Sequence, residues 1–128
     1  MKYKSAIPVI ATADVCATLA YYTRVLDFTE HFVVGDPPVY AGVERDGMLL
    51  YISQDDKLAA TLKGSNLHPD VFLWVRGVDQ VFAEHKRRGA KIVEDISDRP
   101  WDARQYVVED PNGYYLKVAE PTDEVTGR

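Results

Sequence analysis

The chain has 128 residues, and its 20 Asp and Glu outnumber its 15 Lys and Arg, which leaves a formal net charge of −5 at pH 7. This acidity disfavours nucleic acid as a partner, and no run approaches the roughly 20 apolar residues that a membrane span needs. The single Cys16 excludes an internal disulfide. Because the N-terminus also lacks a secretory pattern, we expect a cytoplasmic protein that forms one domain over residues 1–128.

The first predicted elements are a strand over residues 5–10 and a helix for which Asp14 is the expected N-cap. Apolar residues at steps of four, three and four form one stripe along this helix: Val15, Leu19, Tyr22 and Leu26. A stripe with this spacing is typical of a helix that packs one face against a sheet.

Strands are predicted next over residues 28–34 and 39–44, which are rich in aromatic and β-branched side chains. Pro37 and Pro38 interrupt them and belong to a loop. A further strand-like run follows Gly47, which supplies the positive φ that a tight hairpin requires.

The second half of the chain repeats this order. Residues 54–69 are expected to form an irregular connector, followed by a strand over 70–75. A second helix is marked on one face by Val78, Phe82 and His85, and Gly89 is placed to end it in a left-handed conformation. Gly113 then marks a second hairpin.

The two halves match at two separate points, since Gly47 and Gly113 are 66 residues apart and Ile7 and Asp70 are 63 residues apart. A duplicated βαβββ unit explains both offsets. The predicted fold is therefore α+β, with two curled mixed sheets that enclose a cleft. Its parts are tandem modules over 5–55 and 68–120 and a polar tail over 121–128 that is expected to fray.

Several stretches resemble the vicinal oxygen chelate superfamily, which includes glyoxalases, dioxygenases and bleomycin resistance proteins, and the likeness is closest to the bleomycin resistance proteins. They are Ser5–Val9, Tyr40–Asp46, Trp74–Asp79, Arg88–Ala90, Pro100–Trp101 with Arg104, and the Asp-Pro-Asn-Gly hairpin at 110–113. The resemblance covers residues 5–120. It implies the same paired βαβββ fold and a role in antibiotic resistance.

Enzymes of this superfamily hold a divalent cation, and by resemblance the four ligand positions fall on Ile7, Tyr51, Asp70 and Lys117. Ile7 carries no donor atom, and Lys117 binds a metal only when it is deprotonated. No paired spacing brings together the three histidines, His31, His68 and His85. We therefore predict no metal and no other cofactor, a structural role for His85, and for Cys16 the role of a small buried apolar residue.

Alternation along the strands places five side chains on the cleft face: Tyr51, Asp70, Phe72, Trp74 and Lys117. For Phe72 and Trp74 an ordinary core role is an equal alternative. Trp101 follows Pro100 in a polar stretch, where a core role is less expected. By resemblance, Trp101 and a loop residue, Phe32, stack on the planar rings of a drug across a dimer interface. These seven residues are the predicted ligand site, and no catalytic residue is predicted.

The leading functional hypothesis is a non-enzymatic protein of the bleomycin resistance type. It sequesters a planar or cationic small molecule, such as a bleomycin-like drug, at the interface of a homodimer. The alternative is a metal-independent enzyme of the same superfamily in which Asp70 and Lys117 act as acid and base. A sensor or interaction module that retains only the scaffold is a third hypothesis.

Overall fold

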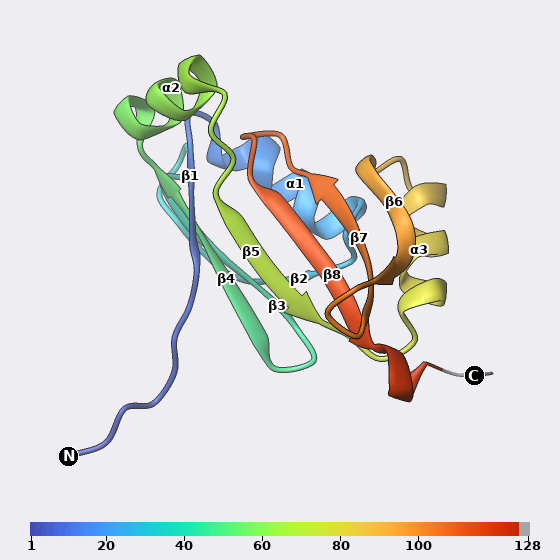
Figure 1. Ribbon diagram of the computed structural model, residues 1–128. Helices are drawn as coiled ribbons and strands as arrows, with labels where there is room; N and C mark the ends of the chain where they lie inside the picture. The colour runs from blue at the N-terminus through green and yellow to red at the C-terminus, as the bar shows by residue number, and fades with distance from the viewer. Residues whose placement is uncertain (126–128) are drawn as a thin grey trace. The chain divides into compact units, whose positions relative to one another are not determined.

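The computed structural model describes residues 1–125. The chain divides into two compact units, one formed by Met1–Ser65 and the other beginning at Asn66 (Figure 1). The single domain expected over 1–128 stays a prediction. Among the described residues no helix has the length and apolar character needed to cross a membrane.

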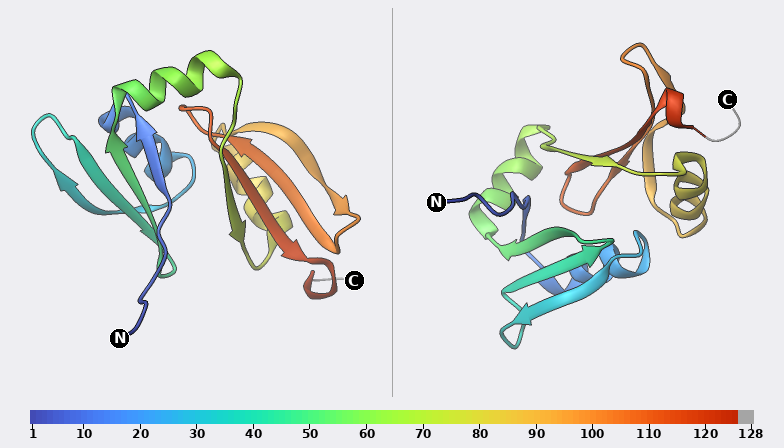
Figure 2. Two further views of the ribbon diagram at one scale, coloured as in Figure 1. Left: turned by 60° about the vertical axis from the view of Figure 1, so that its left-hand side comes forward. Right: turned by 90° about the horizontal axis from the view of Figure 1, so that it is seen from below.

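The first unit is a four-stranded mixed sheet with one helix on its face and a second helix after its last strand. Its elements are β1 (Val9–Thr12), α1 (Val15–Arg24), β2 (Thr29–Val34), β3 (Tyr40–Arg45), β4 (Met48–Gln54) and α2 (Asp56–Ser65). The strand order is β1-β4-β3-β2, with β1 parallel to β4 and the other pairs antiparallel. α1 lies against one face of this sheet (Figure 2).

Local signals explain α1 and the hairpin after β3. The Asp14 carboxylate accepts a hydrogen bond from the Ala17 N–H at 3.0 Å, as an N-cap does. The predicted apolar stripe is largely buried, with Val15, Tyr22 and Leu26 in the core. Gly47 has a φ of +82° between β3 and β4. These predictions are confirmed.

The irregular connector predicted over 54–69 is wrong, because it contains α2. The Asp55 carboxylate accepts a hydrogen bond from the Leu58 N–H at 3.0 Å, and good helix formers follow. None of the residues of α2 is buried. Its apolar residues Leu58, Ala59 and Leu62 lie on one face at helical spacing, but this stripe is short and at most half-buried.

The second unit repeats the plan of the first. Its elements are β5 (Asp70–Trp74), α3 (Val78–Arg87), β6 (Lys91–Arg99), β7 (Ala103–Glu109), β8 (Tyr115–Pro121) and the short 3-10 helix η1 (Thr122–Glu124). The strand order β5-β8-β7-β6 and the parallel β5–β8 pair match the first sheet. The predicted α+β fold of two βαβββ modules with mixed sheets is confirmed.

The polar tail is predicted to fray from residue 121, but its first residues form regular secondary structure. Pro121 ends β8, and the Thr122 N–H, at the start of η1, donates to the Asp102 carbonyl at 2.9 Å. Val125 is buried. The rest of the predicted tail, 126–128, lies outside the described residues.

α3 begins without a side-chain cap of its own. Its N-cap is Gly77, and the cap is completed from β8 by Glu120, whose carboxylate accepts from the Gly77 and Val78 N–H groups at 3.1 and 3.0 Å. Glu120 is only 1% exposed. A carboxylate suits this place because the N-terminus of a helix carries partial positive charge. Gly89, with a φ of +91°, follows the end of the helix as predicted.

Candidate ligand-binding site

The open face of the second sheet is built from three cross-strand rows. The pairing of β5, β8 and β7 gives the rows Asp70–Tyr115–Glu109, Phe72–Lys117–Val107 and Trp74–Ala119–Gln105. The intervening side chains of β5 and β8, Val71, Leu73, Leu116 and Val118, are buried. Because successive side chains on a strand point to opposite faces, this alternation separates a core face beside α3 from the opposite face, here called the open face. The open face is exposed along β5, whereas Ala119 on β8 and Val107 and Gln105 on β7 are buried.

The apolar end of this open face is an exposed aromatic pair. Phe72 is 44% exposed and Trp74 is 59% exposed, with their ring centroids 4.8 Å apart at an interplanar angle of 60°. The alternative prediction that these two side chains belong to the hydrophobic core is therefore wrong. Large exposed aromatic side chains beside each other are typical of a recognition surface.

The polar end of the face carries an ion pair. Lys117 Nζ lies 2.8 Å from Asp70 Oδ2, and the two side chains are 32% and 51% exposed. His68 lies beside them: its ring stacks on Tyr115 with centroids 4.2 Å apart, and its Nδ1 lies 2.8 Å from the Gly113 carbonyl oxygen. Asp70 and Lys117 thus neutralise each other, while both groups retain contact with solvent.

Trp101 stands in the turn between β6 and β7 and is 60% exposed. Its Nε1 donates to Gln105 Oε1 at 3.3 Å. Gln105 is buried and lies in the same row as Trp74, two strands away, a separation of about 10 Å. Trp101 and Trp74 are thus both anchored on one row of the open face, with the small Ala119 between them.

Polar contacts hold the hairpin that carries Trp101. Arg104 on β7 binds both Asp79 of α3 and Asp98 of β6, with its Nη2 2.9 Å from Asp79 Oδ1 and its Nη1 3.2 Å from Asp98 Oδ1. The hydrogen bond that Arg104 donates to Asp79, together with the one it donates to Asp98, raises the pKa of Arg104 above its ordinary value. The guanidinium therefore remains charged and ties the hairpin to the start of α3.

In the first sheet, the row equivalent to Phe72–Lys117–Val107 is Val9–Tyr51–Gly42–Phe32, and it presents a different surface. The ring of Phe32 lies over Gly42, where an added Cβ would be 2.3 Å from Phe32 Cε2. Phe32 also stacks on Tyr40 at 5.7 Å and meets Tyr51 edge to face at 5.2 Å. Its place in a loop, expected from the resemblance, is wrong: Phe32 lies inside β2 at a bulge and is half-buried.

The donor set at the superfamily's ligand positions does not fit a metal. Ile7 precedes β1 and offers no donor, and the Lys117 ammonium already donates to Asp70. Residues 1–125 contain no group of three or more His, Cys, Asp or Glu side chains arranged to hold a metal ion.

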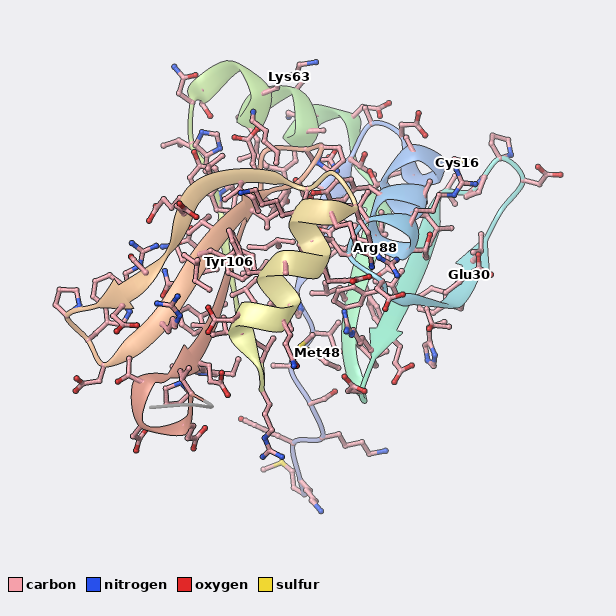
Figure 3. All side chains as sticks on the ribbon, turned by 90° about the vertical axis from the view of Figure 1, so that its right-hand side faces the viewer. Cys16, Glu30, Met48, Lys63, Arg88 and Tyr106 are labelled. Atoms are coloured by element: carbon pink, nitrogen blue, oxygen red, sulfur yellow. The ribbon has the colours of Figure 1, made fainter. Side chains whose placement is uncertain are left out.

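Two other residues singled out in the sequence have contrasting positions. His85 is buried in α3, and its Nδ1 lies 2.7 Å from the Tyr106 hydroxyl, so the predicted structural role is confirmed. Cys16 lies on α1 and is exposed, so its prediction as a buried apolar residue is wrong (Figure 3). Successive residues of a helix point in different directions, so Cys16, which directly follows the buried Val15, lies off the apolar stripe. The next member of that stripe is Leu19.

Sequence reasoning missed Tyr40 and Gln105. Tyr40 completes the aromatic cluster around Gly42, and a glycine within a predicted strand is the signal that another group approaches it closely. Gln105 had no comparable signal, because its hydrogen bond to Trp101 depends on the geometry of the hairpin.

The sequence profile of the Glyoxalase/Bleomycin resistance protein/Dioxygenase superfamily matches residues 6–118. With two βαβββ modules and this match over most of its length, the chain belongs to that superfamily. Comparison with curated protein sequences returned no match.

Solved structures similar to this chain include TioX, a bleomycin-binding protein and a bleomycin resistance determinant. TioX from Micromonospora sp. ML1 has a TM-score of 0.77 at 23% identity, covering 93% of this chain and 99% of its own. The bleomycin-binding protein of Streptomyces verticillus in complex with copper(II)-bleomycin has a TM-score of 0.72 at 24% identity, covering 92% and 96%. The bleomycin resistance determinant encoded on transposon Tn5 has a TM-score of 0.75 at 16% identity, covering 92% and 98%. At these identities the likeness shows the fold.

Proposed function

We propose that this chain is a non-enzymatic binding protein that sequesters a planar, cationic small molecule. The observation that carries the proposal is the exposure of three large aromatic side chains, Phe72, Trp74 and Trp101, on and beside the open face of one sheet. Ring stacking on such side chains holds a planar ligand without any chemical step. The net charge of −5 favours the capture of a cation.

The neighbouring structures support a bleomycin-like ligand as the first candidate, because one of them is a bleomycin-binding protein in complex with copper(II)-bleomycin. We propose that the functional form is a homodimer. In that form, Trp101 of one copy and Phe32 of the other stack on the ligand. Phe32 is half-buried against Tyr40 and Tyr51, so it contributes a firmly held ring edge to such a site.

Titration calorimetry with copper(II)-bleomycin and with ethidium, a planar cation, tests the proposal. Trp101→Ala is expected to weaken binding about tenfold, the equivalent of losing one aromatic stacking contact. Val34→Ala, which truncates an exposed apolar side chain on β2, is the control and should keep the wild-type affinity. An unchanged affinity in Trp101→Ala would show that Trp101 is not an anchor. Light scattering on the same samples tests the dimer.

A metal-independent enzyme is the second candidate, and the polar end of the open face favours it. Asp70 and Lys117 form an accessible acid and base pair, with the His68 ring next to them on Tyr115. Mass spectrometry of the ligand after prolonged incubation separates the two functions. Recovery of the unchanged ligand supports sequestration, whereas a new product that is lost in Lys117→Ala supports the enzyme.

A further inference from the structure

A pocket opens in the second unit beyond the aromatic pair, where β5 ends and β8 passes into η1. It has a volume of about 400 Å³ and is lined by Trp74, Val75, Arg76, Pro121 and Glu124. The two chain segments are joined there by a hydrogen bond from the Val75 N–H to the Ala119 carbonyl at 2.8 Å. This volume falls within the range of small-molecule sites.

Trp74 connects this pocket to the open face. Its indole packs edge to face on Phe72 and also lines the pocket, so a planar ring lying against it reaches the charged groups at the rim. An aromatic wall with few, well-placed polar groups is the usual design of a site for a small molecule.

The rim carries two opposite charges that are available to a ligand. Arg76 and Glu124 are both exposed, and within residues 1–125 neither side chain forms an ion pair or a hydrogen bond. Other arginines of the same unit are engaged: Arg104 binds Asp79, and Arg99 binds Glu94. Arg76 and Glu124 therefore differ from the charges that hold the fold together.

We propose that this pocket is a subsite for an aromatic zwitterion, a planar ring that bears both an ammonium and a carboxylate group. The ring lies on Trp74, the carboxylate pairs with Arg76, and the ammonium pairs with Glu124. A ligand with only one charge leaves one rim group without a partner, so the pocket discriminates by the presence of both charges. The proposal rests on the proposed function and names the ligand chemistry at one end of the same face.

Three indoles that share one ring system test the subsite: L-tryptophan with both charges, tryptamine with only the ammonium, and indole-3-acetate with only the carboxylate. Ligand-observed NMR on the full chain measures their affinities. We expect L-tryptophan to bind most tightly. Arg76→Gln should weaken L-tryptophan and indole-3-acetate about tenfold and leave tryptamine unweakened, whereas Glu124→Gln should weaken L-tryptophan and tryptamine and spare indole-3-acetate.

Lys63→Gln and Glu30→Gln are the matched controls, since each makes the same change of charge at an exposed position of the first unit. Equal affinities for the three probes overturn the subsite, as do losses in Arg76→Gln and Glu124→Gln that ignore the charge of the probe. If no indole binds while ethidium still does, the subsite is wrong and the proposed function stands. If neither indoles nor ethidium and copper(II)-bleomycin bind, both are overturned.

Discussion

α1 and α3 occupy the same place in the two modules, yet their N-termini are stabilised by different means. α1 is capped by Asp14, the residue directly before its first turn. α3 starts after a glycine, and its free N–H groups are bonded by Glu120, which comes from the last strand of its module. A repeated fold can thus keep a helix in place while the group that caps it moves to a distant part of the chain.

The open faces of the two sheets differ as much as the helix caps. The row Val9–Tyr51–Gly42–Phe32 of the first sheet corresponds to Phe72–Lys117–Val107–Glu94 in the second. In the first row, aromatic rings pack on one another over a glycine. In the second row an aromatic ring stays exposed beside a charge, which is why we propose the ligand site mainly on the second sheet.

The largest expected effect is at the distant cap. Glu120→Ala should lower the free energy of unfolding by about 3 kcal/mol, because it removes a buried carboxylate and leaves two N–H groups of α3 without an acceptor. Urea denaturation measures the loss. Glu120→Gln, which keeps an acceptor, should lose less, and Asp123→Ala at an exposed position of η1 is the control. A loss in Glu120→Ala no greater than in the control would contradict the cap.

The aromatic row of the first sheet should be nearly as sensitive. Gly42→Ala should cost about 2 kcal/mol, because its Cβ would lie 2.3 Å from Phe32 and the ring must move away. Gly64→Ala is the matched control, since nothing lies within 4 Å of an added Cβ there, and in α2 it should be neutral or slightly stabilising. If Phe32→Ala does not reduce the cost of Gly42→Ala, the clash is not its cause.

The local cap of α1 should contribute less to the free energy of unfolding than the distant cap of α3. Asp14→Ala is expected to lower stability by about 1 kcal/mol, the usual value for an exposed N-cap. Asp14→Asn should retain most of that stability because the amide oxygen still accepts from the Ala17 N–H. Thermal unfolding of both variants provides the measurement, and equal losses in the two would rule out capping as the explanation.

The smallest effect is expected at the ion pair of the open face. Lys117→Ala and Asp70→Ala should each change stability by about 0.5 kcal/mol or less, because the pair is 32% and 51% exposed and water screens it. The effect should fade further at high salt. A loss of several kcal/mol in either variant would mean that the pair is shielded from water in the functional state.

The topology of both sheets was predictable because it follows from signals close in sequence. Asp14 marks the start of a helix, and Gly47 and Gly113 mark hairpins at equivalent positions of the two modules. α2 was not predicted, because its apolar stripe of Leu58, Ala59 and Leu62 is short and none of its side chains is buried. The rule that caps lie beside the helix they cap also fails at α3, where Glu120 is remote.

The candidate site was predictable only in part. Strand alternation correctly places Phe72, Trp74 and Lys117 on one face, because every second side chain of a strand points to the same side whatever packs against the sheet. Alternation does not say whether such a face is covered, and only the structure shows these rings to be exposed. The rim charges of the pocket, Arg76 and Glu124, had no signal, because turns rather than a repeat bring them together.

The remote cap has a consequence for the order in which the second module folds. α1 can form its capped first turn from neighbouring residues, whereas α3 acquires its cap only after β8 has reached the sheet, more than forty positions along the chain. Contacts of such sequence separation are slow to form, since a long loop must close first. We therefore expect Glu120 substitutions to act mainly on the unfolding rate, and Asp14 substitutions to act more on the folding rate.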